Sequence, residues 1–153
     1  MQERISYSEF YKAQPVLAKS LIAIGEAVLA SGLEVSLYHL VKLRASQING
    51  CAFCQHMHSN EARKDGESQT RLDVLPAWHE VPFFNNRERA ALGWTEALTQ
   101  IAGKGISDEA FAKVSAEFTQ TEIVNLTALI VSINSWNRIA VGVRFTPKQD
   151  QVA

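Results

Sequence analysis

Two cysteines lie three residues apart, as Cys51 and Cys54, and His58 follows four residues later. On a helix, residues three and four positions apart share a face, so these three side chains fall on one stripe. Two helical residues three apart have Cα atoms separated by roughly 5 to 5.5 Å, which a disulfide can bridge without movement of the backbone. The pair can therefore cycle between a dithiol and a disulfide.

This group also has the means to form a nucleophile. Unpaired N–H groups and the helix dipole favour an anion at a helix start, and thiols there have pKa values well below the free value of about 8.5. His58 can accept the thiol proton, because the ordinary pKa of histidine is about 6.5. A peroxide oxidises a thiolate to a sulfenic acid, which a second thiol converts to a disulfide. We therefore predict that Cys51, Cys54 and His58 are catalytic.

Two other interpretations of the cysteine pair stay open, namely a metal site and an inert pair. Zinc needs four ligands in a structural site, or three and a water in a catalytic one. Cys51, Cys54 and His58 could supply three ligands and His39 a fourth. Our prediction is that the protein uses no metal and no cofactor. Gln55 rather than a histidine follows Cys54, so the pattern for haem attachment is absent.

The composition indicates one globular domain over residues 1–153. The chain has a mass of 17.0 kDa, and 46% of its residues are hydrophobic. Its net charge of -1 suggests neither a nucleic-acid partner nor a membrane surface. A secretory signal peptide has a basic start followed by an apolar stretch, and the N-terminal residues do not show this pattern. We therefore expect the protein to be cytoplasmic. In a reducing compartment, two closely spaced cysteine residues are more often catalytic or metal-binding than structural.

Helical periodicity dominates the chain, and we predict an all-α fold. No strand–helix–strand pattern surrounds the cysteines, which argues against a thioredoxin fold. The last predicted helix is apolar around most of its circumference, so we expect it to be buried centrally or against another subunit. Polar residues interrupt its apolar run, and we predict no membrane span. The predicted helices cover 15–32, 34–48, 51–66, 71–78, 87–102, 107–118 and a long segment after the capping-box residues Thr119 and Glu122.

Three polar residues on this last helix require partners if they are buried. They are Asn134, Asn137 and Arg138. A buried polar group without a hydrogen bond is costly, so we expect these side chains to form hydrogen bonds at a subunit interface or near the cysteines.

Residues 40–66, LVKLRASQINGCAFCQHMHSNEARKDG, resemble the core of the alkylhydroperoxidase D-like branch of the carboxymuconolactone decarboxylase family. Weaker resemblance continues through 87–99 and 133–141. The resemblance implies a helical subunit that forms homo-oligomers, commonly trimers or hexamers, and that acts as a peroxidase. It also implies that Cys54 attacks the peroxide, that Cys51 is the more accessible resolving cysteine, and that His58 is the motif histidine.

The sequence departs from this family at two positions of the proton relay. His39 occupies the position of the usual glutamate, twelve residues before the first cysteine, and Phe53 occupies the position of a second relay histidine. Either His39 replaces the glutamate as a proton acceptor and is catalytic, or turnover is slow and the natural substrate differs. Glu61 lies one turn beyond His58 and could orient it, but we interpret Glu61 as part of a solvated helix face.

The function that we predict is reduction of peroxides by a thiol-dependent peroxidase. Its partners are then a peroxide substrate and a dithiol reductant or redox protein, for which a lipoyl- or thioredoxin-like partner is conceivable. A general disulfide oxidoreductase or redox sensor is the nearest alternative. A non-redox decarboxylase-like or metal-binding protein is the third, although decarboxylation does not call for a dithiol.

Overall fold

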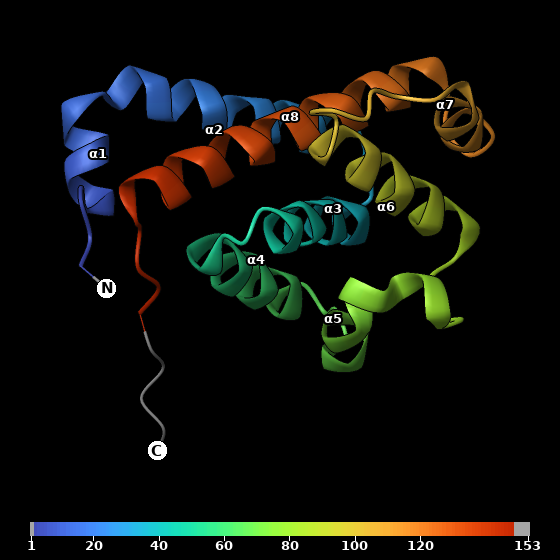
Figure 1. The fold of residues 1–153 in the computed structure, drawn as a ribbon, viewed down its shortest axis with the longest axis horizontal. Coiled ribbons are helices and arrows are strands. Elements are labelled where there is room, and N and C mark those ends of the chain that lie inside the picture. The colour runs from blue at the N-terminus through green and yellow to red at the C-terminus, as the bar shows by residue number, and fades with distance from the viewer. Residues whose placement is uncertain (1, 149–153) are drawn as a thin grey trace.

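The computed structural model describes residues 2–148, and every regular element within this range is a helix (Figure 1). This confirms the all-α prediction for that part of the chain. The domain predicted over residues 1–153 also includes 1 and 149–153, which lie outside the described residues. The elements are α1 (Tyr7–Ala13), α2 (Pro15–Ala30), α3 (Val35–Ile48), α4 (Ala52–Lys64), α5 (Gln69–Val74), the 3-10 helix η1 (Leu75–Glu80), α6 (Asn86–Thr99), α7 (Asp108–Ser115) and α8 (Gln120–Val143).

Local sequence signals set most of these boundaries. Pro15 occupies the start of α2, where its missing N–H costs nothing. Ser107 caps α7 through a hydrogen bond from the backbone of Ala110. Thr119 and Glu122 form the capping box expected before α8. These predicted boundaries are confirmed.

Two segments differ from the prediction. Helix α1 was not expected, and it begins at a capping box formed by Ser6 and Glu9. The single helix expected over 71–78 is instead the end of α5 followed by η1, and Ala77 has non-helical backbone angles. Pro76 accounts for this change, because it donates no backbone hydrogen bond and its ring obstructs a continuous α-helix.

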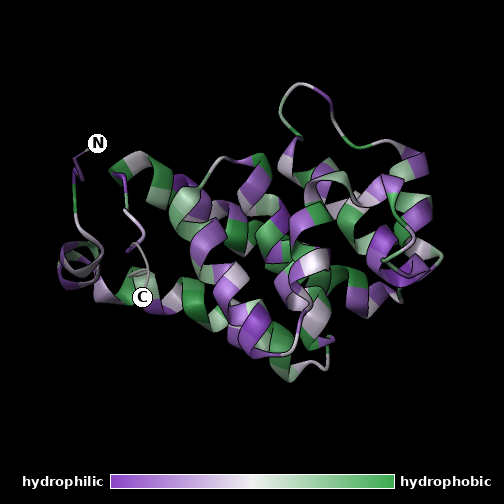
Figure 2. Cartoon of the chain, turned by 90° about the horizontal axis from the view of Figure 1, so that it is seen from below, coloured by the Kyte–Doolittle hydropathy of each residue, from purple (hydrophilic) through white to green (hydrophobic). Residues whose placement is uncertain are grey.

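Helix α3 lies at the centre of the molecule and contacts α4, α6 and α8. One side of α3 packs into a core with α2, α6, α7 and α8, through Leu37 and Val41. Its other side packs against α4, α5, η1 and α6, through Leu40 and Leu43. Figure 2 shows hydrophobic and hydrophilic residues intermixed along the helices, as expected when each helix buries one side. The C-terminal end of α3 is therefore held from several directions, and the cysteines follow it directly.

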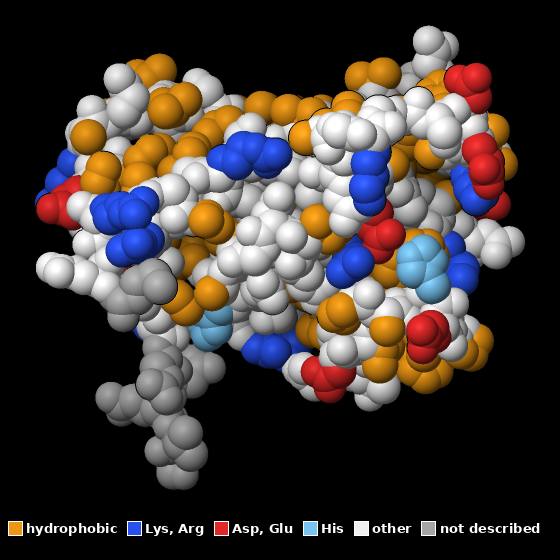
Figure 3. All heavy atoms as spheres, viewed as in Figure 1, with side chains coloured by type: hydrophobic (Ala, Val, Ile, Leu, Met, Phe, Trp, Pro, Cys, Tyr) orange, Lys and Arg blue, Asp and Glu red, His pale blue; other side chains and the backbone are white. Residues whose placement is uncertain are grey.

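Helix α8 is packed against the other helices and also has an exposed apolar side. It meets a length and hydropathy criterion for a membrane span, but so do core helices of soluble proteins, and 44% of its most apolar window is buried here. Helices α1 and α2 meet the criterion only as a pair bent by 106°. Hydrophobic side chains gather along the edge of the molecule formed by α1, α2 and α8 (Figure 3). Exposed apolar residues of α2 and α8 include Val16, Leu17, Leu29, Val124 and Val131.

Candidate active site

A tight turn between α3 and α4 positions the first cysteine. Gly50 has a φ of 65°, in the left-handed region that favours glycine. The backbone N–H of Gly50 donates to Gln47 and that of Cys51 donates to Ser46, which satisfies carbonyl groups at the end of α3. Cys51 is also the N-cap residue of α4. Cys51 thus closes the turn that follows α3 and caps the start of α4.

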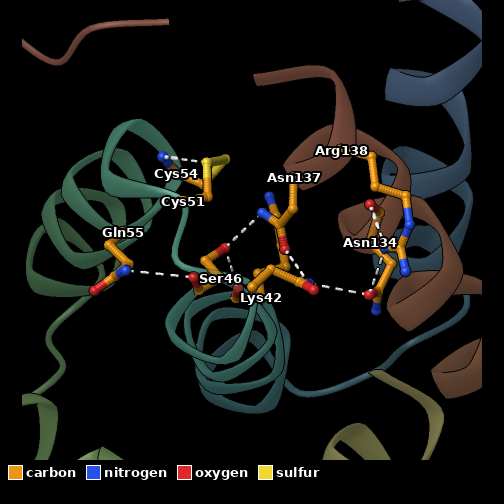
Figure 4. The surroundings of a disulfide bond; sticks show 9 residues. Lys42, Ser46, Cys51, Cys54, Gln55, Asn134, Asn137 and Arg138 are labelled. Atoms are coloured by element: carbon orange, nitrogen blue, oxygen red, sulfur yellow. Dashed lines mark hydrogen bonds between the residues drawn. A yellow bond between two sulfur atoms is a disulfide. The ribbon is translucent and has the colours of Figure 1, made fainter. Parts of the chain in front are cut away.

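Cys51 and Cys54 are joined by a disulfide, with their Cα atoms 5.3 Å apart (Figure 4). The backbone N–H of Cys54 lies 3.2 Å from Sγ of Cys51, so the sulfur takes the place of a capping oxygen. The predicted geometry of the pair is therefore confirmed. The greater accessibility expected for Cys51 is not observed, because Cys51 is 1% exposed and Cys54 is 2% exposed.

His58 lies one turn after Cys54 and is also buried. Burial lowers the pKa of His58 to about 4; the hydrogen bond to Glu61 opposes this effect, and the charge of Lys42 adds to it. The imidazole is therefore neutral near pH 7. A neutral imidazole on the same helix face as Cys54 can accept a proton.

Glu61 contacts His58 directly. Its Oε2 lies 2.8 Å from Nδ1 of His58 and 3.9 Å from Nζ of Lys42. Burial favours a raised pKa for Glu61, but the hydrogen bond from His58 and the charges of His58 and Lys42 outweigh it and lower the pKa. The interpretation of Glu61 as part of a solvated helix face was therefore incomplete: the side chain is 43% exposed, and it also contacts the histidine.

The structure places His39 away from the cysteine pair. Nε2 of His39 lies 2.6 Å from Oδ2 of Asp65, just beyond the end of α4. Its Nδ1 is buried and has no hydrogen-bond partner among the described residues. His39 lines a separate hollow with Ser36 and Asp65, whereas Cys54 and His58 line another cavity together. A relay role for His39 stays a prediction.

The cavity beside Cys54 has a volume of about 270 Å³ and lies between α1, α2, α3, α4 and α8. At one end it presents polar groups of Tyr38, Lys42, His58 and Glu61. The rest of its wall is mostly aliphatic and aromatic. A larger hollow between α6 and α7 contains neither cysteine. The aromatic residues that line the cavity are Tyr7, Tyr11, Phe53, Trp136 and Phe145.

An aromatic cluster covers the disulfide, and we call it the aromatic cap. It consists of Tyr7 and Phe10 of α1, Phe53 of α4, and Phe145 after α8. Ring centroids of neighbouring members lie 5.4 to 5.8 Å apart. Phe10, Phe53 and Phe145 pack with the cysteines in one apolar cluster. The backbone of Arg4 donates to Val143 at 3.0 Å, which ties the N-terminal segment to α8. Sequence analysis did not identify this cap.

A polar network anchors the end of α3 to α8. Nδ2 of Asn49 donates to Oδ1 of Asn134 at 3.0 Å and to Oδ1 of Asn137 at 2.9 Å. Asn137 in turn donates to Oγ of Ser46 at 3.0 Å (Figure 4). Arg138 donates to Asn134 at 2.9 Å. The expectation of hydrogen bonds near the cysteines is confirmed for Asn134 and Asn137, whereas Arg138 is exposed and donates to its own helix.

The alternative of a metal site lacks support from the geometry. Among residues 2–148, no three or more His, Cys, Asp or Glu side chains form a group that could hold a metal ion. His39 binds Asp65, and the two sulfurs bind each other.

The model of the carboxymuconolactone decarboxylase family matches residues 15–97, which is more than half of the chain. This chain belongs to that family. Within the family it falls in the alkylhydroperoxidase D-like branch, as the core motif indicated. The family match includes α2, the cysteine turn and most of α6, whereas α1 and α8 lie outside it.

Individual proteins are also similar to this chain. The uncharacterized protein YdfG of Bacillus subtilis (strain 168) is 38% identical over 141 residues, covering 92% of this chain and 94% of YdfG. A protein of unknown function from Agrobacterium tumefaciens, suggested to be the antioxidant defence protein AhpD, is 45% identical, with a TM-score of 0.91 over 97% of this chain and 100% of its own. The debrominase Bmp8 shares the fold at 18% identity, with a TM-score of 0.80 over 90% of this chain and 74% of its own.

Proposed function

We propose that the protein is a thiol-dependent peroxidase that reduces peroxides through Cys51 and Cys54. The observation that supports this most directly is that Cys54 and His58 share the wall of one apolar cavity, while Cys51 is bonded to Cys54. A cavity of about 150 Å³ can hold benzene. The cavity here, at about 270 Å³, is large enough for a small organic hydroperoxide.

The reaction has three steps. His58 takes the proton of the Cys54 thiol, and the thiolate attacks the peroxide, so that an S–O bond forms, the O–O bond breaks and an alcohol leaves with the proton from His58. The Cys51 thiol then displaces water from the sulfenic acid and forms the disulfide. A dithiol reductant finally reduces the disulfide by thiol–disulfide exchange. Both cysteines return to thiols, and the reductant becomes a disulfide.

Titration of free thiols tests this proposal. The reduced protein is treated with about one equivalent of cumene hydroperoxide, and the cycle is repeated with excess dithiothreitol. We expect both thiols to be lost, and the reductant to support many cycles of peroxide consumption. Thiols that survive the peroxide would overturn the proposal.

The nearest alternative is a general disulfide oxidoreductase or redox sensor that uses the same cysteines. The burial of both cysteines favours the peroxidase, because a small peroxide that enters the cavity reaches Cys54 more easily than a protein disulfide does. Slow oxidation by peroxide together with fast exchange with protein disulfides would favour the alternative.

We also propose that the protein is cytoplasmic and forms a homo-oligomer, a trimer or hexamer, as the family resemblance implies. The exposed apolar residues on α2 and α8 support a contact between subunits there, since apolar patches on a monomer surface are often interaction sites. Light scattering coupled to size-exclusion chromatography measures the subunit number, and a mass of 17 kDa would contradict the assembly.

A further inference from the structure

The ring of His58 has two nitrogens, and one of them already has a partner. Nδ1 lies 2.8 Å from Oε2 of Glu61, three residues later on the same helix. Because Glu61 is more acidic than an ordinary glutamate, its carboxylate is ionised near pH 7 and can only accept a hydrogen bond. A neutral His58 must therefore carry its proton on Nδ1. Its Nε2 is then the nitrogen with a free lone pair.

Lys42 of α3 also favours the ionised state of Glu61, although it lowers the pKa of Glu61 less than the hydrogen bond from His58 does. Nζ of Lys42 lies 3.9 Å from Oε2 of Glu61 and donates to the hydroxyl of Tyr38 at 3.2 Å. The Lys42 side chain is only 15% exposed, so its charge is little screened by solvent. The positive charge favours the Glu61 carboxylate and disfavours protonation of His58, as the directions of both pKa shifts indicate.

We propose that Glu61 is the positioning residue of the site: with Lys42, it fixes His58 in the tautomer that presents Nε2 as the base for the Cys54 thiol. This inference rests on the proposed function only for the statement that the Cys54 thiolate reacts with a peroxide. When Nε2 takes the thiol proton, the imidazolium is stabilised by the Glu61 carboxylate at Nδ1. Part of Glu61 is exposed to solvent, so it also offers a route by which a proton can leave the buried histidine.

Other ionisable groups also face this site. His39 of α3 is close enough for its charge to affect His58 and Glu61. The cavity wall further contains Glu26 of α2, Tyr38 of α3, and Tyr7 and Tyr11 of α1. None of these five groups hydrogen-bonds His58 among the contacts of residues 2–148, whereas Glu61 does. Glu61 is therefore the residue to change.

The test uses Glu61→Gln, with Glu109→Gln as a control. Gln keeps the shape of glutamate but loses the charge, and Glu109 is an exposed carboxylate of α7 that pairs with Lys113. The first readout is the tautomer of His58 at pH 7, from the nitrogen chemical shifts of the folded protein. The second is the rate at which iodoacetamide alkylates Cys54 in the reduced protein with Cys51→Ser. We expect the Nδ1–H tautomer in wild type and in Glu109→Gln, but a mixture of tautomers in Glu61→Gln.

Alkylation should slow by at least roughly tenfold in Glu61→Gln, as a part of the 10²–10⁴-fold that general acid–base catalysis typically contributes. An unchanged tautomer with unchanged alkylation would overturn the role of Glu61. Neither readout uses peroxide, so both can succeed even if wild type shows no peroxide turnover. That combination would reject the peroxidase proposal and keep Glu61 as the residue that positions the base.

Discussion

Asn49, the residue that ends α3, donates its side-chain amide to Oδ1 of Asn137 in α8 at 2.9 Å. Asn137 is 1% exposed, so this bond is made away from water. The pair joins the last residue before the Gly50 turn to a helix that lies nearly ninety positions later in the chain. The location of Cys51 is therefore fixed by tertiary contacts as well as by the local turn.

The first prediction concerns this pair. Asn137→Leu should lower the free energy of unfolding by roughly 1–3 kcal/mol, because it removes the hydrogen bond that Asn137 accepts from Asn49 and the one that it donates to the buried Ser46. Urea denaturation measures the change. Thr121→Ala is a suitable control, since Thr121 lies on the same helix but is exposed, and it should change the stability by less than about 0.5 kcal/mol.

The two cysteines should behave differently when each is replaced. Cys54→Ser should abolish peroxide consumption, because Cys54 is the cysteine that lines the cavity. Cys51→Ser should permit a single oxidation, trapped as a sulfenic acid or a mixed disulfide. Mass spectrometry after one equivalent of hydroperoxide distinguishes these products. Full turnover in either variant would contradict the assignment.

A third prediction follows from the buried histidine. The pKa of His58 is about 4 in the folded protein and about 6.5 in an unfolded chain. Below pH 6.5 the unfolded state therefore binds more protons, so stability falls as the pH decreases from 6.5 toward 4, by up to about 3 kcal/mol. Urea denaturation at pH 7 and pH 5 measures the loss. His58→Gln should show a shallower pH dependence, and an equally steep one would assign the loss to other groups.

A fourth prediction concerns His39. A proton relay through His39 predicts that His39→Gln shifts the pH–rate profile of peroxide reduction. Because Nε2 of His39 is held by Asp65, we instead expect an unchanged profile and a loss of stability of about 1 kcal/mol. Steady-state kinetics between pH 5.5 and 8.5, together with urea denaturation, decides between the two. A shifted profile would instead support a place for His39 in the relay.

Much of the fold was accessible from sequence because the signals are local. Pro15, Gly50 and the Thr119–Glu122 capping box each act within a few residues, and the structure has helix boundaries at all three. The spacing of the cysteine pair is also local, because it depends only on helix geometry. These features do not require knowledge of what packs against them.

Features that depend on distant contacts could not be predicted in this way. Helix α1 has only seven residues and buries none of them fully, so the local signals for it were short: the spacing of Tyr7, Phe10 and Tyr11 on one face and the Ser6–Glu9 capping box. Glu61 is at a spacing that suits contact with His58, but its ionised state depends on Lys42 from another helix. His39 faces Asp65 because of how α3 crosses the end of α4, which no local pattern encodes.

The aromatic cap also affects how the oxidised enzyme would be regenerated. A small thiol that fits the cavity reaches Cys54 directly, so its reduction rate rises in proportion to its concentration. A protein dithiol is too large for this route, so it would reach the disulfide only if Phe10, which packs in the cluster with the cysteines, moved away. Its rate would then reach a plateau set by how often α1 detaches, whatever the supply of reductant. Regeneration by a protein would thus be limited by motion of α1.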